Sequence, residues 1–127
     1  MKKVIRLGVA VLAASIALGI GLKSALAQDP FEVGPEHYAL LLENEKVRVA
    51  EFKFAPGDSM GMHSHPDHVV YILSGGTLQL SYPDGTTKDI AGNPGDVLWG
   101  AAESHATANT GTTEVRGIII ELKEATP

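Results

Sequence analysis

The sequence predicts an all-β protein, built as a sandwich or a barrel, and three observations lead to that expectation. Short apolar or alternating runs recur between residues 38 and 122, with turn sequences about every 8 to 12 residues. These runs are rich in Val, Ile and Phe, while helical periodicity is weak. A chain of 127 residues has room for a single domain with one core.

Residues 1–27 are typical of a bacterial secretory signal peptide. Basic residues open the chain, residues 7–22 contain one polar side chain, and Ala25-Leu26-Ala27 is an A-x-A cleavage pattern. An uncleaved membrane anchor is the alternative, but this apolar run is shorter than the ~20 residues that span a bilayer. We expect cleavage after Ala27, a location in the periplasm or outside the cell, and no stable membrane association afterwards.

An N-terminal arm and the first strand are expected over residues 28–44. Prolines, a glycine and acidic residues between 28 and 36 indicate an extended arm, and the apolar run 38–42 indicates a short strand. Residues 46–54 predict the next strand. Their apolar phase shifts midway, which indicates either a bulge near Ala50 and Glu51 or burial on both faces.

The β-barrel proper is expected over residues 45–127. The Asp84-Gly85 pair favours a two-residue hairpin, and residues 93–96 form another turn signal. The last apolar run is too hydrophobic for a strand with one wet face, so we expect it to be buried inside the barrel and against another sheet or subunit. The further strands are expected at residues 68–73, 77–82, 86–90, 97–99, 105–109 and 114–122.

Composition excludes several classes of function. Without residues 1–27, the chain keeps six of its ten basic residues and all fifteen acidic ones, so its formal charge falls from −5 to −9. That balance argues against nucleic acid and against anionic membrane surfaces as partners. The chain has no cysteine, which excludes disulfides, thiol catalysis and cysteine-ligated metals.

Four histidines form the candidate metal site. His63 and His65 are two residues apart, so on a strand they project from the same face. After a Pro-Asp turn, His68 can face the same interior, and His105 arrives from a distant strand. Converging neutral imidazoles are what divalent transition metals bind. An isolated histidine is more often a packed or surface residue, and we interpret His37 in that way.

The histidine pattern resembles the first sequence motif of the cupins. Gly57, five residues, His63-x-His65 and six residues between His68 and Gly75 follow that motif, except that His68 stands where the motif has glutamate. Only two residues separate it from His65, where the motif has three or four.

The second cupin motif is similar to residues 95–109, with its histidine at His105 and its asparagine at Asn109. Gly100 and Ala102 replace its usual proline and glycine. The resemblance covers about residues 45–122 and implies a single cupin domain, a double-stranded β-helix or jelly-roll barrel. The chain looks like small single-domain bacterial cupins that lie near those linked to β-alanine breakdown.

The resemblance implies one bound divalent transition metal, which can be Fe, Mn, Zn, Ni or Cu. Four neutral ligands would leave its +2 charge intact and favour a small anionic ligand, such as a carboxylate, an enol or a 1,3-dicarbonyl. If His68 swings away, three histidines remain, a set that the resemblance links to oxygenases. We expect a metal-dependent, dioxygenase-like oxidoreductase acting on a small organic acid or dicarbonyl. A non-catalytic ligand-binding protein and a structural metal site are the alternatives.

No side chain stands out as a catalytic acid or base, and the catalytic residues stay unknown at this stage. Trp99, Asn109 and Tyr71 are candidates for the substrate pocket. Core packing is the alternative for Trp99 and Tyr71, and a backbone hydrogen bond is the alternative for Asn109. Glu103 is interpreted as a solvated loop residue, with a role as a hydrogen-bond partner of the site as the alternative. A homodimer is expected from the resemblance, from the apolar last strand and from the N-terminal arm.

Overall fold

The computed structural model describes residues 28–124. The predicted signal peptide and its cleavage site lie outside the described residues. Within the described part, no helix is long and apolar enough to cross a membrane.

Nine strands and one short helix make up the described chain, so the all-β expectation is confirmed. The predicted strands are found with their ends shifted by at most two residues, and one further strand carries the first two site histidines. The elements are α2 (Pro30–Val33), β1 (Tyr38–Glu43), β2 (Val47–Phe54), β3 (Ser59–His65), β4 (His68–Ser74), β5 (Gly76–Ser81), β6 (Thr87–Gly92), β7 (Val97–Gly100), β8 (Glu103–Asn109) and β9 (Val115–Leu122).

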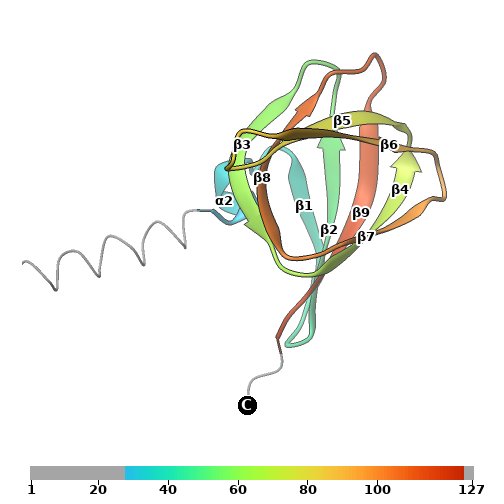
Figure 1. The fold of residues 1–127 in the computed structure, drawn as a ribbon. Helices are drawn as coiled ribbons and strands as arrows, with labels where there is room; N and C mark the ends of the chain where they lie inside the picture. Colours follow the sequence, from blue (N-terminus) through green and yellow to red (C-terminus); the bar gives the residue numbers. More distant parts are fainter. Residues whose placement is uncertain (1–27, 125–127) are drawn as a thin grey trace, which may run out of the picture.

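Two antiparallel sheets form the barrel. The five-stranded sheet has the order β1-β2-β9-β4-β7, and the four-stranded sheet has the order β3-β8-β5-β6. Figure 1 shows them facing each other, with α2 beside β3. Because β3 and β4 belong to different sheets, the turn at Pro66 and Asp67 carries the chain from one sheet to the other between His65 and His68.

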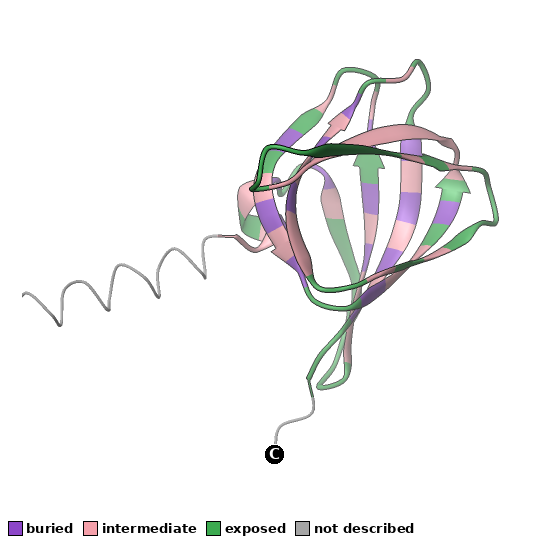
Figure 2. Ribbon diagram, in the orientation of Figure 1, coloured by how far each residue is buried: buried purple, intermediate pink, exposed green. Residues whose placement is uncertain are grey.

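The core follows the alternation of the strands. Along β9, buried and half-buried residues alternate from Val115 to Glu121 (Figure 2). The buried side chains of β2 and β9 pack inside the barrel, with Phe52, Phe54 and Ile119 among them. The outward residues Ile118 and Ile120 are half-buried, so burial on both faces of this strand is only partial in the single chain.

The arm differs from the prediction because it contains α2. The carboxylate of Asp29 accepts a hydrogen bond from the backbone of Phe31, and Pro30 occupies the first helical turn. An Asp N-cap followed by Pro is a typical helix start. The sequence does not reveal the hydrogen bonds that join this segment to the barrel, between Gln28 and Ser64 and between Asp29 and Arg48.

The bulge expected near Ala50 and Glu51 is not found in β2. Strand β2 pairs with β9 in unbroken register, and the irregularity lies opposite, in β1 between Leu40 and Leu42. Val49 is half-buried and Ala50 is buried, so the phase shift reflects partial burial on both faces, which was the other expectation.

The β5–β6 hairpin is longer than the predicted two-residue turn. A reverse turn closes through the bond from Gly85 N to Tyr82 O, and Tyr82 N also bonds to Thr86 O. Only Gly85 has a positive φ, at 86°, so Asp84 does not adopt the left-handed conformation that a type I′ turn needs. Pro83 favours instead the first central position of an ordinary turn.

Candidate metal centre

Strands β3 and β8 bring three histidines together. His63 and His105 are direct cross-strand partners, and His65 lies two residues further along the same face of β3. All three are buried, and one ring nitrogen from each lies within 4.8 Å of the other two. The group could therefore hold a metal ion.

A bulge in β3 sets which residues face inward. The register shifts between Met60 and His63, so two residues of β3, Gly61 and Met62, oppose one residue of β8. Without the extra residue, alternation would turn Met60 and His63 to opposite faces. With it, Met60 is buried in the core and His63 is completely buried in the histidine group.

Hydrogen bonds from Nδ1 fix the orientation of two of the imidazole rings. The Nδ1 atom of His63 donates to Gly61 O at 2.8 Å, and that of His65 donates to the carboxylate of Glu121 at 3.0 Å. In the neutral form of such a ring, the proton is on Nδ1 and Nε2 is the electron-pair donor.

Two buried ring nitrogens have no hydrogen-bond partner within the described chain, Nε2 of His63 and Nδ1 of His105. The nearest carboxylate oxygen to the latter belongs to Glu103, at 3.5 Å. Buried polar atoms are almost always paired, so the unpaired Nε2 of His63, a member of the three-histidine group, needs an explanation. An imidazole-binding divalent ion supplies one, and the donor set fits it.

Burial also keeps these histidines neutral. It lowers the pKa of His63 to about 4, and burial together with the neighbouring histidines lowers the pKa of His105 to about 3. Neutral imidazole is the form that ligates a metal, so His63 and His105 need no deprotonation near neutral pH.

His68 lies beside this group rather than within it. It is buried at the start of β4, its ring centre is 5.2 Å from that of His65, and its Nδ1 donates to Pro66 O at 2.7 Å. Its cross-strand partner is Gly100, where an added Cβ would stand 2.2 Å from His68 Nε2. The missing side chain at position 100 therefore provides the space that the imidazole of His68 occupies.

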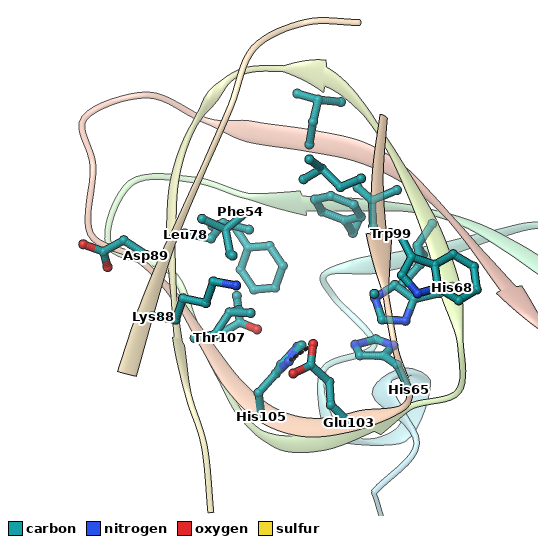
Figure 3. A pocket seen from close by; sticks show the side chains of 18 of the residues that line it. Phe54, His65, His68, Leu78, Lys88, Asp89, Trp99, Glu103, His105 and Thr107 are labelled. Carbon is teal, nitrogen blue, oxygen red and sulfur yellow. Dashed lines mark ion pairs between the residues drawn. The ribbon is translucent and has the colours of Figure 1, made fainter. Parts of the chain in front are cut away.

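A cavity of about 410 Å³ reaches the histidines from the barrel interior. His65, His68 and His105 line one end (Figure 3), and side chains such as Phe54, Ile72 and Ile119 form its apolar wall. Lys88 and Asp89 lie on the opposite side of the view from His68. Lys88 is the only lysine or arginine among the lining residues.

The predicted pocket residues have three different outcomes. Trp99 lines the cavity and is 61% exposed, so it stands at the opening and is not a core residue. Tyr71 is exposed and absent from the lining, because β4 turns Val70 and Ile72 inward instead.

Asn109 does not face the cavity. Its amide nitrogen donates to Phe54 O and Thr113 O, and its oxygen accepts from Gly111 N. It holds backbone segments together, which was the alternative. Glu103, expected as a solvated loop residue, instead begins β8 and lines the cavity beside His105.

Sequence reasoning missed Glu121, the buried carboxylate that bonds to His65. Burial alone would raise its pKa, but hydrogen bonds from His65 and Arg48 outweigh that effect and lower it, so the group is ionised. A signal did exist: Glu121 shares the inward phase of β9 with Val115 and Ile119. His37 behaves as expected for a packed residue, stacked on Phe54 with ring centres 4.4 Å apart.

The fold and the site together define the class of protein: a small antiparallel β-barrel with a buried histidine cluster beside its cavity. Among solved structures, the chain is similar to a cupin domain of Bordetella pertussis Tohama I, with 30% identity and a TM-score of 0.63 over 68% of this chain and 92% of that one. It is also similar to a cupin superfamily protein of Desulfitobacterium hafniense, with 27% identity and a TM-score of 0.53 over 68% of this chain and 76% of that one. The chain belongs to the cupin superfamily.

Two further comparisons bear on function. A predicted oxalate decarboxylase of Thermotoga maritima is 30% identical with a TM-score of 0.50, over 68% of this chain and 79% of that one. The β-alanine degradation protein BauB of Pseudomonas aeruginosa is 47% identical over 45 residues, which are 35% of this chain and about half of that protein's length (47%). No protein-family model matches the chain.

Proposed function

We propose that this protein is a metal-dependent oxidoreductase of the oxygenase type, acting on a small organic acid or dicarbonyl compound. His63, His65 and His105 would hold a divalent transition metal, with His68 beside them as a fourth ligand. Bound iron or manganese would supply redox chemistry with dioxygen, whereas zinc or nickel would supply Lewis-acid chemistry.

The observation that carries this proposal is the cavity. A structural metal site is usually closed by its protein ligands, while a catalytic site keeps an open position. Here His65 and His105 of the metal group, with His68 beside them, line a cavity of about 410 Å³ whose wall is mainly apolar. A small molecule that enters this cavity would contact the metal directly and would be shielded from bulk water.

The same cavity favours an anionic substrate with a short apolar body. A metal held by neutral imidazoles retains its full charge and attracts carboxylate or enolate oxygens. Lys88 adds one positive side chain to the lining. The names of two relatives, one a β-alanine degradation protein and the other a predicted oxalate decarboxylase, refer to small carboxylates.

We also propose that the protein works in the periplasm or outside the cell as a homodimer. The location rests on the A-x-A pattern that ends at Ala27. The dimer is supported by Leu40, Leu41 and Leu42, which are each more than half exposed on β1, an edge strand of the five-stranded sheet. Exposed apolar edges of this kind favour association with a second chain.

Metal content tests the proposal first. The protein is expressed as the full chain, purified without chelator and analysed by elemental mass spectrometry, beside His63→Ala and His37→Gln. His37→Gln is the matched control because His37 is also buried but lies outside the group. We expect near-stoichiometric iron or manganese in the wild type and in His37→Gln, and none in His63→Ala.

Oxygen uptake is then measured with oxalate, malonate, β-alanine and acetylacetone as probes. Consumption that depends on both metal and substrate supports the oxygenase. Stoichiometric zinc with no turnover would replace it by a binding or structural role, and no metal after reconstitution would overturn the metal centre itself.

A further inference from the structure

A line of charged hydrogen bonds connects His65 to the first described residues of the chain. Glu121 Oε2 accepts from His65 Nδ1 at 3.0 Å, and Glu121 Oε1 accepts from Arg48 Nε at 2.8 Å. The other end of the guanidinium donates from Nη1 to Asp29 Oδ2 at 2.8 Å. Four side chains from β3, β9, β2 and the N-terminal segment thus share one network.

Glu121 cannot hold its position alone. It is 3% exposed, and a buried carboxylate is stable only when both oxygens are hydrogen-bonded or paired with a positive charge. His65 satisfies one oxygen and Arg48 the other. If Arg48 moved away, the carboxylate would turn toward water or toward a different partner, and the hydrogen bond that orients His65 would weaken.

Arg48 is held by residues outside the barrel strands. Asp29 pairs with its Nη1, and the ring of Phe31 lies 4.5 Å from its guanidinium carbon. Both residues belong to the segment Gln28–Gly34, which we call the N-terminal clamp. The Nε atom of the same guanidinium group donates to the buried carboxylate of Glu121. The clamp therefore fixes Arg48 between two acidic side chains, Asp29 and Glu121.

The clamp is also fastened beside the histidines. Gln28 O accepts from Ser64 N, and Gln28 Oε1 accepts from Ser64 Oγ, both at 2.7 Å. Ser64 stands between His63 and His65 on β3. At the other end of the clamp, an added Cβ at Gly34 would lie 2.8 Å from the sulfur of Met60, so the backbone there is closely packed on β3.

We propose that the N-terminal clamp is a positioning element of the metal centre, which orients His65 through Asp29, Arg48 and Glu121. The relevance to metal binding rests on the function proposed above, but the orientation of His65 can be measured without a metal. Removing an outer hydrogen-bond partner of a ligating histidine typically lowers metal affinity about 10- to 100-fold.

Asp29→Asn perturbs the relay, the hydrogen-bonded series Asp29–Arg48–Glu121–His65, without removing the N-cap of α2. Asn is as good an N-cap as Asp, so α2 keeps its first hydrogen bond. Its amide nitrogen, however, is a hydrogen-bond donor, and it replaces the carboxylate oxygen that accepted a hydrogen bond from Arg48. Glu51→Gln is the matched control, because Glu51 also lies on β2 and pairs with a β9 arginine, Arg116, at 2.7 Å, with no link to His65.

Zn²⁺ affinity is measured by competition with a chromophoric chelator, and the absorption spectrum of the Co²⁺ form reports the ligand set. We expect about a 10- to 100-fold loss of Zn²⁺ affinity in Glu121→Gln, a smaller loss in Asp29→Asn, and wild-type affinity in Glu51→Gln. Arg48→Lys keeps the positive charge but cannot bind both carboxylates at once as the guanidinium group does. Its Zn²⁺ affinity should therefore lie between those of Arg48→Ala and the wild type.

Long-range ¹H–¹⁵N spectra of the metal-free protein give the independent reading of the His65 ring. We expect the Nδ1–H tautomer in the wild type, its loss in Glu121→Gln and a shifted ring signal in Asp29→Asn. Unchanged ring signals and unchanged affinity in Asp29→Asn would overturn the relay. A wild type that binds no Zn²⁺ but shows the expected ring signals would defeat the proposed function and leave the relay standing.

Discussion

Gly100→Ala tests the most unusual contact of the site, the imidazole of His68 lying over a backbone that has no side chain. The added Cβ would stand 2.2 Å from His68 Nε2 and 2.4 Å from Cε1. Carbon and nitrogen atoms prefer separations of about 3.5 Å, so the ring must withdraw by about 1 Å. That movement strains the 2.7 Å bond from His68 Nδ1 to Pro66 O.

The expected cost is that of overpacking a buried site, about 1 to 3 kcal/mol of unfolding free energy. Because the ring is displaced from its place beside His65, we also expect Zn²⁺ affinity to fall about as much as in His68→Ala. Urea unfolding measures the first effect and chelator competition the second. Gly111→Ala is the control, since its Cβ would meet no atom closer than 3.4 Å and the residue lies outside the site.

The double variant His68→Ala with Gly100→Ala makes the test decisive. If the clash is the cause, removing the imidazole removes the penalty, and the two changes are strongly non-additive. Simple additivity, or a Gly100→Ala protein with wild-type stability and affinity, would refute the placement of His68 over Gly100. A loss of stability without a loss of affinity would show that His68 is not a ligand.

Three further predictions concern pH, substrate and assembly. The metal-free protein should lose stability as the pH falls from 6.5 toward 4, because the unfolded chain then binds protons that buried His63 (pKa about 4) and His105 (pKa about 3) do not. The loss is about 2 kcal/mol per histidine at pH 5, and a flat urea-unfolding profile between pH 7 and 5 would contradict it. Lys88→Ala should raise the KM for an anionic substrate with little change in kcat, while an equal effect on a neutral analogue would argue against charge recognition. Leu41→Asp should convert a dimer to a monomer in light scattering, whereas Val97→Asp, at the edge formed by β7, should not; a monomeric wild type would contradict the dimer.

The strands and the histidine pattern were predictable because they depend on local order. Alternation of apolar residues identifies strands, and a spacing of two residues places His63 and His65 on one face whatever the rest of the chain does. The turn signal at residues 93–96 was reliable for the same reason, since Gly95 takes the positive φ that its turn requires.

Features set by register were not predictable. Whether His105 meets His63 depends on how β3 pairs with β8, and that pairing contains a bulge that no local signal locates. The role of Glu121 depends on β9 lying between β2 and β4, far apart in the sequence. Trp99 lines the cavity, as its candidacy for the pocket anticipated, but its high exposure was not predictable, because it depends on a short strand at a sheet edge, where a large apolar side chain can stay exposed.

Two of the departures from the cupin motifs are related in space. His68 replaces the motif's glutamate, Gly100 replaces its proline, and the two residues are cross-strand partners in contact. The buried carboxylate near the histidines is instead Glu121, which bonds to the far side of His65 and shares its charge with Arg48. The negative charge is thus moved from a ligand position to a place behind a ligand. A metal in this site would keep more positive charge for its substrate, which is why we infer an anionic one.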